Sequence, residues 1–101
     1  MGIGNFLSKL FGGTKVDYSE LIKNGAVIVD VRTPQEFKSG HVKGSKNIPL
    51  QKIGNSISKL KGKEVILVCR SGGRAGSAKG TLGRSGIVAH NAGAWQNLNG
   101  V

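Results

Sequence analysis

The sequence has little cysteine, few aromatic residues and few acids, and each shortage excludes a class of protein. Its one cysteine, Cys69, rules out an internal disulfide and a cysteine-rich zinc site. Five Asp and Glu residues stand against fifteen Lys and Arg, a formal net charge of +10, so the surface attracts anions. Because no aromatic-rich basic motif accompanies that charge, we expect no nucleic acid partner. We also expect no metal and no cofactor.

Long apolar runs are absent too. The chain of 101 residues has no segment that reads as a membrane span or a secretory signal. With a free thiol, this predicts a cytoplasmic location. The length suits one compact domain with a single hydrophobic core.

An amphipathic segment over residues 1–13 precedes the predicted domain, which covers residues 14–101. Its apolar residues recur at i, i+3, i+4, i+7 and i+8, which is the spacing of one helical stripe. Two interpretations remain open: a helix that docks on the domain or frays, and an anchor that contacts a membrane surface. The stripe consists of Ile3, Phe6, Leu7, Leu10 and Phe11.

Predicted strands and helices alternate along the rest of the chain. Such alternation implies right-handed crossovers, and so we predict an α/β fold with a mainly parallel central sheet and helices on both faces. Capping pairs at Asp17–Glu20 and Thr33–Glu36 mark two helix starts. We predict strands at 26–31, 47–48, 64–68 and 87–89, and helices at 18–24, 33–40, 50–60, 74–82 and 92–98.

Cys69 lies where the apolar run 65–68 ends and a glycine- and arginine-rich loop begins. In a parallel sheet, sites form at the carboxyl ends of strands. Backbone N–H groups at Gly72 and Gly73, the following helix and the charges of Arg70 and Arg74 all favour an anion there. We therefore expect a thiolate with a pKa below the free value of about 8.5. The alternative is a cysteine that acts only as a small buried hydrophobe.

Four ordered motifs resemble the rhodanese (sulfurtransferase) family over residues 17–100, and they imply one small, single rhodanese-like domain. One departure occurs at residues 92–95, where the family often has Gly-Gly before its last helix and this chain has Ala-Gly-Ala-Trp. The motifs are Asp30-Val-Arg32-Thr-Pro-Gln-Glu36-Phe37, Gly40-His41-Val42-Lys43-Gly44-Ser45, Asn47-Ile48-Pro49 and Cys69-Arg-Ser-Gly-Gly-Arg74.

The resemblance implies a sulfurtransferase in which Cys69 carries sulfur as a persulfide. A small anionic donor such as thiosulfate would load the cysteine, and cyanide in an assay, a small thiol or a protein would accept the sulfur. The substrate-binding residues would be Arg70, Ser71, Gly72, Gly73 and Arg74, with Arg74 either binding substrate or bracing the loop. A rhodanese-like sulfur carrier or protein-interaction module without enzyme activity is the alternative.

Loop length separates this hypothesis from phosphatase chemistry. Four residues stand between Cys69 and Arg74. Cysteine phosphatases have five, which gives a larger loop around a tetrahedral phosphate. The position that their arginine would occupy is Ala75, whose side chain cannot bind a phosphoryl oxygen.

The remaining motif residues have structural interpretations as well as functional ones. Asp30 either orients the loop amides or pairs with Arg32, and Arg32 either attracts anions at the mouth of the site or only completes that pair. We expect Glu36 to cap its helix, His41 to hold a turn and Trp95 to belong to the core.

Overall fold

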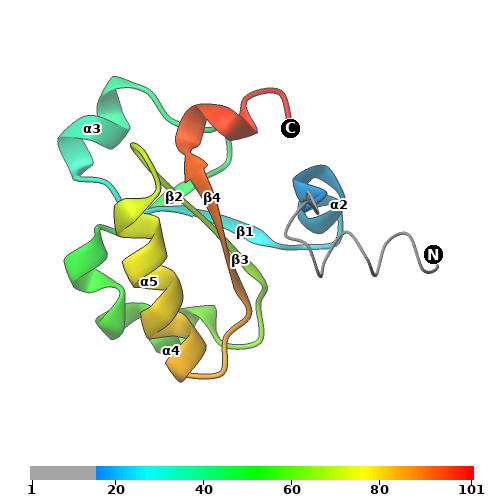
Figure 1. Cartoon of the computed structure of the whole chain (residues 1–101), viewed down its shortest axis with the longest axis vertical. Coiled ribbons are helices and arrows are strands. Elements are labelled where there is room, and N and C mark those ends of the chain that lie inside the picture. The colour runs from blue at the N-terminus through cyan, green and yellow to red at the C-terminus, as the bar shows by residue number, and fades with distance from the viewer. Residues whose placement is uncertain (1–15) are drawn as a thin grey trace.

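The computed structural model describes residues 16–101, so the segment predicted at residues 1–13 lies outside the described part. Four strands form one parallel sheet in the order β2-β1-β3-β4 (Figure 1). This confirms the α/β fold class with a parallel sheet. The strands are β1 (Val27–Asp30), β2 (Lys46–Asn47), β3 (Val65–Cys69) and β4 (Ala89–Ala94).

The two central strands, β1 and β3, have apolar side chains on both faces because helices cover both sides of the sheet. Two hydrophobic clusters result, one on each face. Figure 1 shows α4 (Ile57–Leu60) and α5 (Gly73–Arg84) on one side of the sheet and α2 (Tyr18–Lys23) on the other. The predicted helices on both faces are therefore present.

Side chains alternate along β3, and this alternation directs the cysteine. Val65, Leu67 and Cys69 belong to the cluster beneath α5, whereas Ile66 and Val68 belong to the opposite cluster. The thiol therefore faces α5 at the carboxyl end of a strand whose residues are almost completely buried. A shift of register by one residue would turn it to the other face.

Capping hydrogen bonds mark the starts of two short helices, α2 and α3. The Asp17 carboxylate accepts a hydrogen bond from the Glu20 N–H at the start of α2. Before α3 (Pro34–Ser39), Thr33 and Glu36 form the complete predicted capping box, with the Glu36 N–H donating to Thr33 Oγ1 and the Thr33 N–H donating to Glu36 Oε1. Both helix starts agree with the sequence.

Four predicted elements were wrong in extent. The helix expected at 50–60 is divided into η1 (Leu50–Lys52), η2 (Gly54–Ser56) and α4. The strand expected at 87–89 begins only at Ala89 and continues to Ala94, so the helix expected at 92–98 is reduced to the 3-10 helix η3 (Trp95–Leu98). Strand β2 lies one residue before the predicted 47–48. Pairing with β3 explains β4, whose own sequence has low strand propensity.

Within residues 16–101, no helix combines the length and the apolar character that crossing a bilayer requires.

Candidate active site

The sulfur of Cys69 accepts hydrogen bonds from the loop that follows it. The Gly72 N–H donates to Sγ at 3.0 Å, and the Ala75 N–H donates at 3.4 Å. The side chain is only 1% exposed. Because the loop's N–H groups converge on one atom, the chain has built a small anion-binding nest around the thiol.

The same sulfur occupies the place of an N-cap side chain for α5. Helix starts normally have a side-chain oxygen that accepts the third N–H, but the N-cap here is Gly72, which has none. The third helical residue, Ala75, donates to Cys69 Sγ instead. Gly72 adopts a φ of +106°, in the left-handed region, and this allows the loop to fold back over the sulfur. The positive end of the 12-residue helix is thereby directed at Sγ.

These contacts lower the pKa of Cys69. Burial opposes them and is the largest single influence, since it raises the pKa of a thiol. Backbone N–H groups of Ala75, Gly72, Ser71 and Arg74 together outweigh burial and hold the pKa below the ordinary value of 9.0. The direction is as predicted, and the backbone N–H groups named in that prediction are the main cause that lowers the pKa. The charge of Arg74 also attracts the Cys69 thiolate.

We expect the thiolate of Cys69 to form at lower pH than a free cysteine. Because the chain has one cysteine, the ultraviolet absorbance that Cys69→Ser removes reports that thiol alone. As pH rises, this absorbance should appear with a midpoint below 9.0, and denaturation should move the midpoint upward. The free energy of unfolding accordingly rises as pH increases from the pKa of the folded state to that of the unfolded state. Equal midpoints in the two states would contradict the lowered pKa.

Arg74 is tied to Glu36, 38 residues earlier in the chain. Nη1 donates to Oε1 at 2.7 Å and Nη2 donates to Oε2 at 3.1 Å, a bidentate ion pair. The bonds from Arg74, with the backbone N–H of Thr33, lower the pKa of Glu36 to about 2. A carboxylate with a lowered pKa stabilises the fold above its unfolded value of 4.5, and this contribution is lost as pH falls toward 2. At neutral pH, Arg74 therefore braces the loop against α3.

A second brace comes from β4, and no local sequence pattern indicates it. The Asn91 amide donates to the Gly72 carbonyl at 2.9 Å, and the Gly93 N–H donates to Asn91 Oδ1 at 2.9 Å. Asn91 thus fixes the residue whose N–H reaches the sulfur. Asn91 reaches the cysteine loop because β4 pairs with β3, and this pairing joins distant parts of the chain.

Two loop side chains face solvent. Arg70 and Ser71 are exposed, and within residues 16–101 neither side chain has a hydrogen-bonded protein partner. Arg70 lines a depression of about 300 Å³ together with Arg32, Glu36, Ser39, Trp95 and Gln96. Of the two loop guanidinium groups, only that of Arg70 lacks an acidic partner in the described chain.

Asp30 does not contact the loop amides and instead pairs with Arg32. Its side chain is fully buried, and Arg32 Nη2 donates to Oδ2 at 2.7 Å while Nε donates to Oδ1 at 2.9 Å. Arg32 also donates to the carbonyls of Glu36 and Gly40, the latter at 2.7 Å. The pair therefore holds α3, and through Glu36 it supports the brace of the cysteine loop.

The aromatic residues flanking α3 are fixed by neighbouring groups. His41 stacks on Phe37 with ring centroids 3.7 Å apart, and its Nδ1 lies 2.7 Å from the Phe37 carbonyl oxygen. This is the turn-holding arrangement that the sequence predicted. Trp95 is partly buried rather than a full core residue, and the Arg32 guanidinium lies 5.0 Å from its ring centroid.

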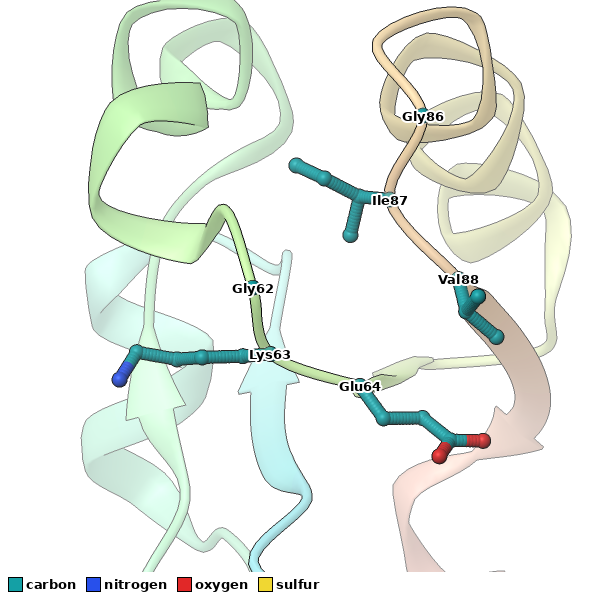
Figure 2. A pocket seen from close by; sticks show the side chains of 6 residues that line it. All are labelled: Gly62, Lys63, Glu64, Gly86, Ile87 and Val88. Carbon is teal, nitrogen blue, oxygen red and sulfur yellow. The ribbon is translucent and has the colours of Figure 1, made fainter.

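A second depression lies before β3 and β4, away from the cysteine loop. Figure 2 shows the Ile87 side chain projecting between the two segments that form it. Its one carboxylate, Glu64, is 2.6 Å from His90 Nε2. This second depression lies at the amino ends of the strands. Ligands of parallel sheets bind at the other end, beside the carboxyl ends of the strands. Its lining residues are Gly62, Lys63, Glu64, Gly86, Ile87 and Val88.

Groups of side chains suited to a metal are absent from the described part of the chain. No cluster of three or more His, Cys, Asp or Glu residues occurs within residues 16–101.

A family model of the rhodanese-like domain matches residues 14–99. The chain belongs to the rhodanese-like family. Among solved structures, it is similar to an Escherichia coli rhodanese with anions: the TM-score is 0.68 at 29% identity, over 73% of this chain and 92% of the other. The sequence resemblance and the fold thus identify the same rhodanese-like family.

Curated relatives agree with this family. PspE of Escherichia coli, a thiosulfate sulfurtransferase, is 32% identical over 74 residues, which cover 69% of this chain and 71% of PspE. YqhL of Bacillus subtilis is 39% identical over 64 residues, or 62% of this chain. The rhodanese-like chain spans 51% of YqhL and 37% of the Synechocystis protein slr1261, about half of their lengths or less.

Proposed function

We propose that this protein is a sulfurtransferase that moves sulfane sulfur from thiosulfate, or from a persulfide or polysulfide, to a thiophilic acceptor. One observation carries the proposal: Cys69 Sγ lies at the carboxyl end of β3 and accepts N–H bonds from Gly72 and Ala75. A thiol held in this way is a prepared nucleophile. Family membership and the relative PspE, named for thiosulfate sulfur transfer, support the same reaction class.

The first half-reaction loads the cysteine. The Cys69 thiolate attacks the outer sulfur of thiosulfate and forms a new S–S bond, while the S–S bond of thiosulfate breaks and its electron pair leaves with sulfite. The total charge is conserved, because a monoanion and a dianion give a persulfide anion and a sulfite dianion. The N–H groups that surround Sγ stabilise the anionic sulfur before and after this step.

The second half-reaction returns the thiolate. Cyanide attacks the outer sulfur of the persulfide, the Cys69 S–S bond breaks, and its electron pair returns to Sγ as thiocyanate leaves. A thiol acceptor follows the same course, with its proton passing to the transferred sulfur. Because the cysteine has to be a free thiolate at the start of each cycle, the reaction suits the reducing cytoplasm.

We assign roles to the loop residues on their positions. Arg70, which is exposed and has no acidic partner among residues 16–101, binds the anionic donor at the mouth. Ser71 and Gly72 present backbone N–H groups to the sulfur, and Gly73 begins α5 directly after them. Arg74 acts mainly by bracing the loop through Glu36. Asp30 and Arg32 do not contact the donor sulfur. They support the site indirectly, because Arg32 pairs with Asp30 and donates to the Glu36 carbonyl of α3.

Turnover with thiosulfate and cyanide tests the proposal. We expect thiocyanate to form with ping-pong kinetics, because sulfite leaves before cyanide enters. Sulfur loading without release to cyanide or to any thiol would support the alternative, a carrier module that needs a protein acceptor. Failure to load sulfur from thiosulfate, polysulfide or a small persulfide would contradict both hypotheses.

A further inference from the structure

The depression beside Arg70 is larger than thiosulfate needs. Its volume of about 300 Å³ reaches the lower end of the range that small-molecule sites occupy in proteins. Three separate segments contribute to it: α3 through Glu36 and Ser39, the cysteine loop through Arg70, and η3 through Trp95 and Gln96. Arg70, which lines the depression, directly follows Cys69 in the chain. Room for the body of a second substrate is therefore available beside the residue that follows the nucleophile.

One wall of the depression is a tryptophan whose position is fixed. The Arg32 guanidinium lies 5.0 Å from the Trp95 ring centroid, and the Asp30 carboxylate and Gly40 carbonyl both hold that guanidinium at 2.7 Å. The ring edge also lies close to Gly40, where a Cβ would come within 3.2 Å of Trp95 Cη2. An aromatic wall that is already in place loses little entropy when a ligand packs on it.

In the part of the chain that the structure describes, one cation beside the depression has no acidic partner. Asp30 pairs with Arg32, and Glu36 pairs with Arg74. Arg70 is exposed and has no acidic partner among residues 16–101. A free guanidinium beside an aromatic wall fits a molecule that carries a carboxylate and a short carbon skeleton.

We propose that Trp95 and Gln96 determine acceptor specificity by binding low-molecular-weight thiols that carry a carboxylate. The proposal rests on the sulfur-transfer function, since it concerns the acceptor of that reaction. The thiol's skeleton packs on Trp95, its carboxylate pairs with Arg70, and Gln96 lies at the rim. Its sulfur then attacks the outer sulfur of the Cys69 persulfide. The Cys69 S–S bond breaks, its electron pair returns to Sγ, and the thiol proton moves to the transferred sulfur in the new persulfide.

Binding can be measured without any sulfur transfer, because Trp95 is the one tryptophan in the chain. N-acetyl-S-methylcysteine keeps the carboxylate and has no free thiol, and its amide is a matched neutral probe. We expect the carboxylate form to change Trp95 fluorescence with a Kd on the order of 1 mM. The amide should bind about fivefold more weakly, as loss of one close charge pair in water predicts.

Charge variants at exposed Gln96 test the site without altering its packing. Gln96→Glu should weaken binding of the carboxylate probe by about two- to fivefold and Gln96→Lys should strengthen it similarly, with little effect on the amide. Asn24 supplies the control, because Asn24→Glu and Asn24→Lys make the same changes in net charge. It is exposed and lies just before β1, at the amino ends of the strands and away from the depression.

The outcomes separate this proposal from the sulfur-transfer proposal. Saturable binding that responds to Gln96 and not to Asn24 supports the pocket even if thiosulfate fails to load Cys69, in which case only the reaction is wrong. Turnover with cyanide but no saturable fluorescence change overturns the acceptor pocket. Equal responses to the Gln96 and Asn24 variants also overturn it, since they would show an effect of overall charge.

Discussion

Cys69→Ser is expected to reduce thiocyanate formation to the background rate, a loss of roughly 10³-fold or more. Serine keeps the shape of the side chain and a hydrogen-bonding group, but it replaces the sulfur with a smaller oxygen whose hydroxyl ionises far above neutral pH. Without a sulfur atom at position 69, the persulfide that links the two half-reactions cannot form. The exposed surface is unaffected, because the side chain at position 69 is only 1% exposed. Steady-state turnover with thiosulfate and cyanide measures the loss.

A second thiol elsewhere provides the matched control for that loss. Ser58→Cys, added to Cys69→Ser, restores one cysteine at an exposed position in α4. It lacks the N–H groups that surround Sγ at position 69, and so turnover should stay at background. Recovery of activity in the double variant would show that any thiol suffices, and the assigned role of the loop would then be wrong.

Asp30→Asn is expected to lower the free energy of unfolding by about 3–5 kcal/mol, the cost of leaving one charge of a buried pair without its partner. Asp30 is 0% exposed and Arg32 is 4% exposed, so water cannot replace the lost carboxylate. Such a change is a large share of the roughly 5–15 kcal/mol that stabilises a domain. Urea unfolding followed by circular dichroism measures it.

The same Asp→Asn substitution at an exposed position shows how much of the destabilisation is due to burial of the charge pair. Asp17 caps α2 through the Glu20 N–H, and asparagine caps a helix about as well as aspartate. Asp17→Asn should therefore leave the unfolding midpoint nearly unchanged. Equal, small effects at both positions would mean that the buried pair contributes little to stability.

The two central strands were predictable because each contains a continuous apolar run, a pattern that does not depend on distant residues. It failed at β4, whose residues Ala-His-Asn-Ala-Gly-Ala have low strand propensity. Pairing with β3 makes this segment a strand, and one irregularity in register lies between Leu67 and Cys69. Such pairing depends on the tertiary fold, and local residue patterns do not show it.

The candidate site divides in the same way. The loop from Cys69 to Arg74 is contiguous, so its composition and spacing are visible in the sequence. Glu36 was expected only as a cap, yet it also binds Arg74 across 38 residues. Asn91 reaches the loop through β4, which the sequence did not predict at that position. Residues that hold a loop from other elements are hard to find because no local pattern links them to it.

The mass of the Cys69 peptide after treatment with thiosulfate tests the central claim most directly. The protein is incubated with thiosulfate, freed of excess reagent, digested without reductant and measured before and after cyanide is added. We predict one added sulfur atom on the peptide that contains Cys69, and its disappearance as thiocyanate forms. An unmodified Cys69 peptide in protein that forms thiocyanate would show that sulfur moves by another route and would contradict the persulfide account.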